Sequence, residues 1–431
     1  MKSLLKLRPS TYIPAALVIG LLVASFALPH SANFGTYKLL TYGYGYGPGG
    51  TFLAPPNQYH PLTPARILDT RGTATIGPNS TLNVPVGGQG GVPTTAQAAV
   101  INVTATNTTA QSYLTIYPTG QTRPGTSNLN WTAGKTVPNL VEIKLGTGGV
   151  VTVYNAQGNV DVIFDVEGYV SVPTGTPGAD GLYNTLVPAR VLDTRNGIGA
   201  PTAQVGPGAS IDLQVTGADG VPATGVEAVV LNVTETNATA MSSYVTVYPK
   251  GVSRPNASNL NFVAGQTVPN RVIVKVGTGG KVTLFNAAGN VDLIADVNGW
   301  FTDGTTSNAA GDIFNGTGPN RIMDTRLGGS PIGPGATIHM NVAGQGGVPA
   351  SGAHSVVLNV TVTMPTANPS SYLTLWPTGA ARPVASDLNF ATGLTVANLV
   401  IVKIDSTTGQ VDVFNAAGTT QVIVDVVGWY N

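Results

Sequence analysis

The sequence predicts an all-β protein: three tandem homologous β-sandwich domains, of jelly-roll or Ig-like type, after an N-terminal hydrophobic export segment. Three observations lead to this prediction. A block of about 110 residues, the size of one sandwich domain, occurs three times. Within each block apolar and polar residues alternate, which is the period of a half-buried strand. Glycine and proline, 55 and 31 of 431 residues, gather in turn-like sequences between these segments.

The composition excludes several classes of function. Charged residues make up only 9% of the chain, and 20 basic residues balance 20 acidic ones. Nucleic-acid binding needs clustered cations, so we expect no nucleic-acid partner. The absence of cysteine excludes disulfides and thiolate chemistry. With four histidines and no Gly-x-Ser-x-Gly or His-Glu-x-x-His motif, we expect no catalytic residues, no cofactor and no metal.

Residues 1–32 are predicted to be a signal peptide or a signal anchor. Three cations precede an uncharged stretch from Thr11 to Leu28. This stretch is longer than a usual signal-peptide core and shorter than a usual spanning helix, so cleavage and retention both stay open. Either outcome makes the chain secreted or attached to the cell surface, with membrane contact only through an uncleaved segment. Residues 33–61, with alternating Tyr and Gly, are predicted to be a spacer.

The repeats share an ordered set of motifs. Pro-x-Arg-x-Leu-Asp-Thr-Arg begins at Pro64 and Pro188, and returns at Pro319 with Met in place of Leu. Gly-Val-Pro, Asn-Val-Thr, an aromatic-Pro-x-Gly-x-x-Arg-Pro segment and a closing Asp-Val-x-Gly-aromatic element follow in the same order each time. Because the period far exceeds the 20–50 residues of solenoid repeats, each unit is predicted to be a whole domain. The expected organisation is repeat 1 at 62–171, a linker at 172–185, repeat 2 at 186–302, a linker at 303–316 and repeat 3 at 317–431.

Within a unit, the segment from Leu140 to Leu145 illustrates the predicted strands. Alternate positions, beginning at Val141, are always Val, Ile or Leu in the three repeats, whereas the positions between them vary. One face of this strand is therefore expected to be core and the other not. We expect flexible linkers to join the three units; the alternative is a compact pseudo-threefold cluster.

This motif set resembles that of a secreted β-repeat surface module of actinobacterial and related proteins, sometimes found beside cell-wall-active enzymes. The resemblance covers about residues 62–430 in three copies and implies an extracellular setting without implying an activity. Repeat 3 departs from the pattern: Gln421 stands where repeats 1 and 2 have Asp161 and Asp292. Any role of that carboxylate is therefore in doubt in repeat 3.

Polar residues that recur at the same positions are candidates for a structural network or a ligand site. They are Arg66, Asp69, Arg71, Asn102, Arg123, Lys144 and Asp165 in repeat 1; Arg190, Asp193, Arg195, Asn232, Arg254, Lys275 and Asp296 in repeat 2; and Arg321, Asp324, Arg326, Asn359, Arg382, Lys403 and Asp425 in repeat 3. Arginine forks bind carboxylates bidentately, which favours an ion-pair network that holds the first and last strands together.

Two other interpretations of these residues stay open. Arg66, Arg71 and Arg123 would be the cations of a site for a carboxylate- or phosphate-bearing wall polymer. Lys144, Asn102 and Asp165 have the residue types of an intramolecular isopeptide bond, but Lys144 alternates with the core face rather than lying on it.

Aromatic residues also recur, and they are candidates for stacking on sugar rings or, alternatively, for covering the sheets. They are Tyr113, Tyr117, Trp131, Tyr244, Tyr248, Tyr372 and Trp376. Asp161 and Asp165, and the loop from Thr302 to Asp312, are weak calcium candidates.

These observations predict a non-enzymatic, secreted or cell-surface repeat protein with a structural or adhesive role. Its expected partners are cell-wall polysaccharide or other surface proteins. The alternative is an array of carbohydrate-binding modules for cell-wall glycan. A hydrolase of unrecognised type is the remote alternative.

Overall fold

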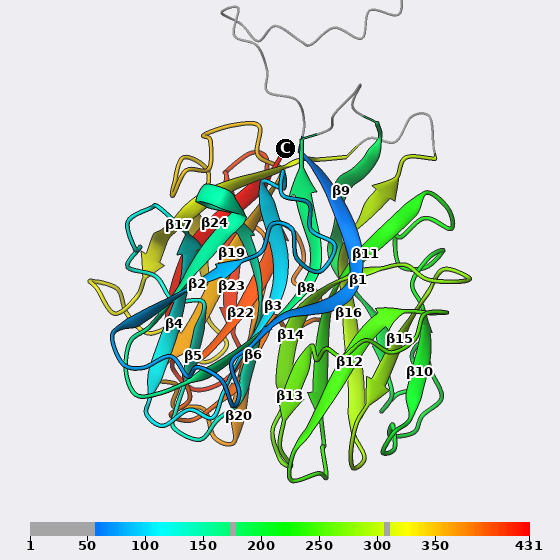
Figure 1. The fold of residues 1–431 in the computed structure, drawn as a ribbon, viewed down its shortest axis with the longest axis horizontal. Helices are drawn as coiled ribbons and strands as arrows, with labels where there is room; N and C mark the ends of the chain where they lie inside the picture. The colour runs from blue at the N-terminus through cyan, green and yellow to red at the C-terminus, as the bar shows by residue number, and fades with distance from the viewer. Residues whose placement is uncertain (1–56, 173–177, 306–310) are drawn as a thin grey trace, which may run out of the picture. The chain divides into compact units, whose positions relative to one another are not determined.

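The computed structural model describes residues 57–172, 178–305 and 311–431 (Figure 1). The predicted export segment, most of the spacer, residues 173–177 of the first linker and 306–310 of the second lie outside the described residues. Within the described ranges, no helix has the length and apolarity that a membrane span requires.

Repeat 1 forms two four-stranded antiparallel sheets. We call the sheet that contains the first strand of a repeat its inner sheet and the second its outer sheet. The inner sheet has the order β1 (Gln58–Asp69), β8 (Asp161–Ser171), β3 (Ala98–Thr106), β6 (Val137–Lys144). The outer sheet has the order β2 (Ser80–Pro85), β7 (Val150–Asn155), β4 (Ser112–Pro118), β5 (Leu129–Trp131), and the 3-10 helix η1 (Thr147–Gly149) precedes β7.

Repeats 2 and 3 have the same topology. The inner sheet of repeat 2 has the order β9 (Asp180–Asp193), β16 (Asp292–Asp303), β11 (Val226–Thr236), β14 (Val268–Lys275), and its outer sheet β10 (Ser210–Gln214), β15 (Lys281–Asn286), β12 (Ser243–Pro249), β13 (Leu260–Phe262). The inner sheet of repeat 3 has the order β17 (Phe314–Asp324), β24 (Gln421–Tyr430), β19 (Ser355–Thr363), β22 (Val396–Lys403), and its outer sheet β18 (Thr337–Asn341), β23 (Gln410–Asn415), β20 (Ser370–Pro377), β21 (Leu388–Ala391).

The all-β prediction is confirmed, but the predicted fold class of three tandem β-sandwich domains is wrong. The chain instead forms six small four-stranded sheets in the arrangement of a six-bladed β-propeller. The repeats are not beads on flexible linkers, because the inner sheets of all three pack on one another. The alternation in the sequence could not reveal this arrangement, since a period of two shows that a strand face is buried but not which repeat covers it.

Four apolar cores hold the sheets together. One core lies within each repeat between its two sheets and includes, in repeat 1, Ile101, Leu114 and Phe164. Equivalent cores lie in repeats 2 and 3. The fourth core takes residues from the inner sheets of all three repeats, among them Val100, Val230, Val357, Leu140 and Leu399. Leu140 belongs to the strand face that the sequence analysis had expected to lie outside any core.

An aromatic cluster occupies one part of this central core and also joins the three repeats. Tyr59 lies 4.3 Å from Phe301 between ring centroids, and Tyr183 lies 4.4 Å from Tyr430. Phe314 lies 5.4 Å from Tyr430. Such pairs add stabilisation beyond the burial of their area.

The glycine of the closing Asp-Val-x-Gly-aromatic motif lies beneath this cluster. A Cβ atom at Gly168 would overlap the ring of Tyr59, and one at Gly299 would overlap Tyr183. The motif therefore requires glycine because the aromatic ring of the first strand packs directly on the backbone of the last.

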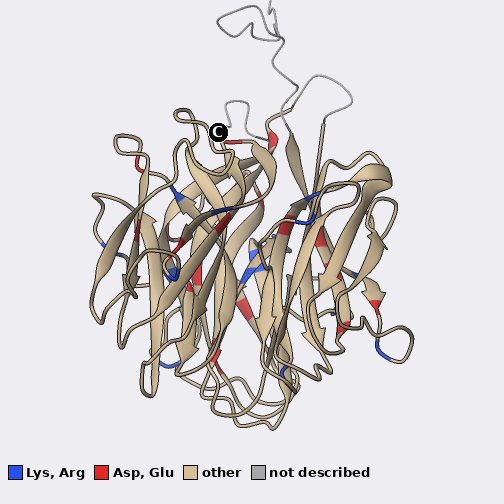
Figure 2. Ribbon diagram, turned by 90° about the vertical axis from the view of Figure 1, so that its left-hand side faces the viewer, with Lys and Arg blue, Asp and Glu red and all other residues tan. Residues whose placement is uncertain are grey.

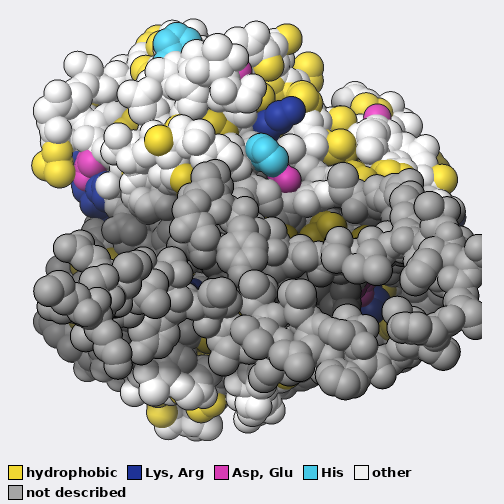
Figure 3. All heavy atoms as spheres, turned by 90° about the horizontal axis from the view of Figure 1, so that it is seen from above, with side chains coloured by type: hydrophobic (Ala, Val, Ile, Leu, Met, Phe, Trp, Pro, Cys, Tyr) yellow, Lys and Arg dark blue, Asp and Glu magenta, His cyan; other side chains and the backbone are white. Residues whose placement is uncertain are grey.

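Charged side chains are sparse on the body. Many of the charged residues belong to strands within the body (Figure 2). On the part of the upper face that the described residues form, the charged side chains are few (Figure 3). The upper face therefore offers no large charged patch among the described residues.

Candidate functional site

The recurring arginines and aspartates form an ion-pair network between the first and last strands of each repeat. In repeat 1, Arg66 on β1 donates from Nε to Asp165 Oδ1 at 2.8 Å and from Nη2 to Oδ2 at 3.0 Å. Arg71 donates from Nε and Nη2 to Asp69 at 2.9 and 2.6 Å, and Arg66 Nη1 lies 3.5 Å from Asp69. Arg66 and Asp165 are also opposite partners in the strand register.

The same contacts recur in the other two repeats. They are Arg190–Asp296 at 2.7 and 3.1 Å, Arg195–Asp193 at 2.9 and 2.7 Å, Arg321–Asp425 at 2.8 and 3.3 Å, and Arg326–Asp324 at 2.8 and 2.6 Å.

Two opposite pKa effects divide the aspartates of this network. Burial raises the pKa of Asp165, although the hydrogen bonds from Arg66 lower it. Hydrogen bonds from Arg195 lower the pKa of Asp193 to about 2. The side chain of Asp193 is as buried as that of Asp165, so at Asp193 the hydrogen bonds from Arg195 outweigh the effect of burial on the pKa.

The recurring asparagines each reach into the next repeat. Asn102 Nδ2 donates to Ser258 O at 2.5 Å, Asn232 Nδ2 to Ser386 O at 2.6 Å, and Asn359 Nδ2 to Ser127 O at 2.6 Å. These contacts run from repeat 1 to 2, from 2 to 3 and from 3 to 1. The three repeats are therefore closed into a ring by buried hydrogen bonds.

A second set of asparagines completes the ring, and the sequence analysis missed it. Asn270 Nδ2 donates to Asn102 Oδ1 at 2.8 Å, Asn398 Nδ2 to Asn232 Oδ1 at 3.0 Å, and Asn139 Nδ2 to Asn359 Oδ1 at 2.9 Å. The signal was available, because asparagine follows Pro138, Pro269 and Ala397 at the same position in every repeat.

Two junctions between repeats each have a buried polar group of their own. Arg271, whose side chain is 0% exposed, donates from Nη2 to Asp387 Oδ1 at 2.9 Å across the junction of repeats 2 and 3. Asn259 Nδ2 donates to Glu167 Oε1 at 2.5 Å across the junction of repeats 1 and 2. These pairs distinguish the junctions from one another and specify which repeats are neighbours.

The junction of repeats 3 and 1 buries Glu142. Tyr430 Oη donates to Glu142 Oε1 at 2.9 Å. Burial raises the pKa of Glu142 to about 8. Glu142 Oε2 is buried without a hydrogen-bond partner among the described residues. A protonated, neutral carboxyl fits this apolar surrounding better than a carboxylate does.

The structure does not assemble the isopeptide candidates. Lys144 lies opposite Ala98 at the end of β6 and is exposed, whereas Asn102 lies opposite Asp165 and Leu140. Lys403 is likewise exposed, and Lys275 Nζ lies 3.8 Å from Glu227.

Arg123 and its equivalents stack on aromatic rings rather than joining the ion-pair network. The guanidinium carbon of Arg123 lies 3.7 Å from the ring centroid of Tyr154, and the ring centroids of Tyr113 and Tyr154 are 6.3 Å apart. Arg254 and Arg382 lie 3.9 and 3.7 Å from the rings of Phe285 and Phe414. Such cation–π contacts stabilise the outer face of each outer sheet.

The predicted sugar-stacking aromatics fall into two groups. Four are buried: Tyr117, Trp131, Tyr248 and Trp376. The remaining three are partly or largely accessible: Tyr113 at 37%, Tyr372 at 36%, and Tyr244 to an intermediate extent. Only this second group can meet a ligand.

The calcium candidates have other partners. Asp161 accepts hydrogen bonds from Thr70 Oγ1 at 3.2 Å and Asn107 Nδ2 at 2.8 Å, and Asp165 binds Arg66. No cluster of three or more acidic or histidine side chains suited to a metal occurs among the described residues. Residues 306–310 of the second candidate loop lie outside them.

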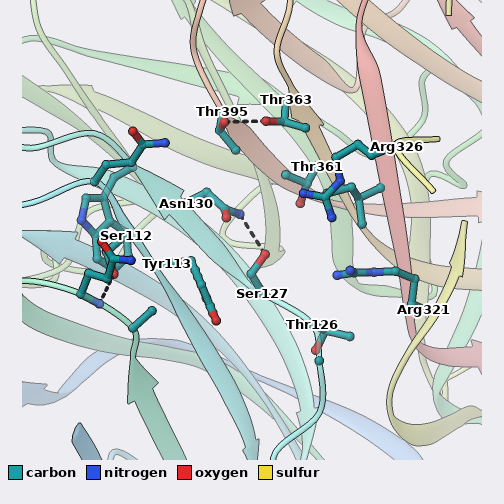
Figure 4. A pocket seen from close by; sticks show the side chains of 16 residues that line it. Ser112, Tyr113, Thr126, Ser127, Asn130, Arg321, Arg326, Thr361, Thr363 and Thr395 are labelled. Atoms are coloured by element: carbon teal, nitrogen blue, oxygen red, sulfur yellow. Dashed lines mark hydrogen bonds between the residues drawn. The ribbon is translucent and has the colours of Figure 1, made fainter. Parts of the chain in front are cut away.

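A cleft of about 450 Å³ lies between repeats 1 and 3 (Figure 4). Repeat 3 contributes Arg321 and Arg326 from its ion-pair network. Repeat 1 contributes Tyr113, Ser127 and Asn130 from β4, β5 and the loop between them. Ser127 and Asn130 are joined by a hydrogen bond of 3.1 Å. The cleft thus combines motif residues that stand far apart in the sequence.

A larger cleft, of about 700 Å³, lies between repeats 2 and 3 and contains the equivalents of the arginines, the serine and the asparagine, but not of Tyr113. Arg190 and Arg195 take the places of Arg321 and Arg326, and Ser386 and Asn389 take those of Ser127 and Asn130. This cleft continues to residues of all three repeats: Pro138, Pro269 and Ala397.

Comparisons with known proteins give no basis for assigning a family. No protein-family model matches the chain, and no curated protein matches it. Matching solved structures include the Sulfolobus Turreted Icosahedral Virus, at 11% identity and a TM-score of 0.18 over 87% of this chain and 91% of that chain. They also include the CBM22-1-CBM22-2 tandem domain of Paenibacillus barcinonensis Xyn10C, at 10% identity and a TM-score of 0.18 over 57% and 97% of the two chains. PNGF-II matches at 8% identity and a TM-score of 0.17 over 78% and 99%. Likenesses this weak carry no argument about function.

Proposed function

We propose that the protein is a non-enzymatic extracellular or cell-surface protein with a structural or adhesive role, of the secreted β-repeat kind that its motifs resemble. The observation that carries the proposal is the closed ring of contacts from Asn102, Asn232 and Asn359 to the next repeat. A body closed in this way holds its surfaces at fixed spacing. Fixed spacing suits a protein that supports or attaches, because a rigid binder loses less conformational entropy when it binds.

The proposal also draws on where the scarce charges lie. Asp165, Asp296 and Asp425 are each about 1% exposed and each binds an arginine of its own repeat. These groups support the architecture directly. We place the protein outside the cytoplasm because of the predicted export segment at 1–32, and its expected partners are wall polysaccharide or other surface proteins.

Sedimentation with purified bacterial cell walls tests the adhesive role. The full chain without its export segment should co-sediment with walls and leave no soluble reducing sugar in the supernatant. Walls stripped of accessory polysaccharide serve as the control and distinguish a glycan partner from a protein partner. Release of reducing sugar would contradict the non-enzymatic role and favour a hydrolase.

A second candidate function, an array of carbohydrate-binding sites, is favoured by the recurrence of the inter-repeat cleft. Two arginines, a serine and an asparagine occupy equivalent positions in the clefts between repeats 3 and 1 and between repeats 2 and 3. Concave sites with a few convergent polar groups and an accessible aromatic ring suit saccharides. A glycan array probed with the same chain tests this function, and the absence of any bound glycan would contradict it.

A further inference from the structure

We propose that the inter-repeat clefts bind an acidic saccharide, with the carboxylate on the arginines of one repeat and, in the cleft between repeats 3 and 1, the sugar ring against Tyr113 of the next. This inference rests on the second function proposed above and specifies its ligand class and contact residues.

The floor of the cleft contains a hydroxyl without a partner. Thr361 is 1% exposed, and its Oγ1 has no hydrogen-bond partner among the described residues. Thr234 in the second cleft is 3% exposed, and its Oγ1 likewise has no partner among the described residues. A buried hydroxyl is normally hydrogen-bonded, so the same unmet group at the lining of both clefts indicates a partner that binds from outside the chain.

The wall of the cleft offers mainly hydrogen-bond donors. The side chains of Arg321 and Arg326 are 29% and 38% exposed, whereas those of their partners Asp425 and Asp324 are only 1% and 4% exposed. The carboxylates are therefore covered and the guanidinium groups face the open side. Arginine has five N–H donors, and Asp324 accepts from Nε and Nη2 of Arg326. The donors left over suit the carboxylate of a ligand.

The opposite wall offers a ring and an amide. Tyr113 is 37% exposed and lies in the cleft together with Asn130 and Ser127 (Figure 4). A tyrosine ring can cover the apolar face of a pyranose, and an asparagine amide can bind its hydroxyls. The volume of about 450 Å³ lies within the range of small-ligand sites.

The acidic class follows from the balance of these groups. A neutral sugar would satisfy the threonine and asparagine but would leave the accessible arginine donors to water. A sugar acid would bind the threonine and the asparagine through its hydroxyls and the arginine donors through its carboxylate. Because the two arginines, the serine and the asparagine recur in clefts at two junctions of one body, a polymer with acidic groups along its length could occupy both, and its apparent affinity would exceed that of a single unit.

Calorimetric titration of the intact body with defined oligosaccharides tests this inference. The probes are oligogalacturonate, a neutral maltooligosaccharide of the same length, and poly(glycerol phosphate) as a phosphate-bearing polymer. The variant Arg195→Gln with Arg326→Gln removes one donor group from each cleft and should weaken oligogalacturonate binding at least tenfold. Lys281→Gln, which removes one charge on β15 outside both clefts, should leave the affinity within twofold.

A second variant guards against loss of folding. Thr361→Val keeps the shape of the side chain and removes the unpaired hydroxyl, so it should weaken binding at the first cleft without lowering the melting temperature. Unchanged binding in both the arginine and threonine variants would overturn the site. Equal affinity for the neutral and acidic oligosaccharides would overturn the acidic ligand class while glycan binding stands. Preference for poly(glycerol phosphate) over oligogalacturonate would overturn the saccharide as the ligand. Failure to bind any probe or any arrayed glycan would overturn both this inference and the second proposed function.

Discussion

Replacing Asp165 with alanine should remove a large share of the stability of the body. Asp165 is 1% exposed and accepts two hydrogen bonds from Arg66, whose side chain is 18% exposed. It also accepts a hydrogen bond of 3.2 Å from the backbone N–H of Ser258 in the next repeat. Breaking a buried ion pair by removing one partner costs about 3–5 kcal/mol, because the other charge loses its partner; here Arg66 would keep only its longer contact with Asp69, at 3.5 Å.

The matched variant is Asp69→Ala in the same network. The Asp69 side chain is 28% exposed and binds Arg71, whose side chain is 48% exposed. An exposed pair is worth about 0–1 kcal/mol, so this variant should lose much less stability than Asp165→Ala. Urea unfolding monitored by tryptophan fluorescence measures both losses. Equal losses, or a larger loss for Asp69→Ala, would refute the view that the buried aspartate of each network holds the strands together.

Three further outcomes follow from the buried groups. Between pH 4.5 and 8 the folded protein keeps the proton of Glu142 that the unfolded chain has released, so this group should lower the free energy of unfolding by about 1.4 kcal/mol per pH unit as pH rises. Glu142→Gln should remove that contribution in urea titrations at pH 5, 7 and 8.5. An unchanged dependence of the unfolding free energy on pH would contradict this prediction. Arg271→Leu alone should cost about 3–5 kcal/mol of stability, because Asp387 stays buried without its partner. Adding Asp387→Asn gives both positions the residues of the other repeats and should restore most of that loss in the same assay. Equal stability of the single and double variants would argue against the pair. Gly168→Ala should lower the melting temperature because its Cβ would overlap the ring of Tyr59, and an unchanged melting temperature in calorimetry would show that the ring is free to move.

The sequence contains enough information to predict the strands and the composition of the ion-pair network. Alternation marked the strand around Val141, and the recurrence of Arg66 and Asp165 at the ends of each unit is expected for residues on its first and last strands. What alternation could not show is that both faces of a strand are buried. Leu140 has arginine at its equivalent in repeat 2, and Glu142 has isoleucine at both of its equivalents, yet Leu140 and Glu142 are both buried.

The clefts could not be predicted from one repeat at a time. Arg326 and Tyr113 stand in different repeats, and only the packing of inner sheets around a common core brings them to one cavity. The second asparagine set was predictable in principle, because Asn139 recurs with the same preceding residues as Asn270. Its role becomes apparent only when its partners in the neighbouring repeat are known.

Small-angle X-ray scattering tests the central claim, that the three repeats form one closed body, most directly. A compact body of the size of Pro55–Asn431 should have a radius of gyration of about 21 Å. Three separate domains on flexible linkers would give a value above about 30 Å. A radius near 21 Å is the result that the ring of inter-repeat contacts predicts, and a radius above 30 Å at low concentration would contradict it.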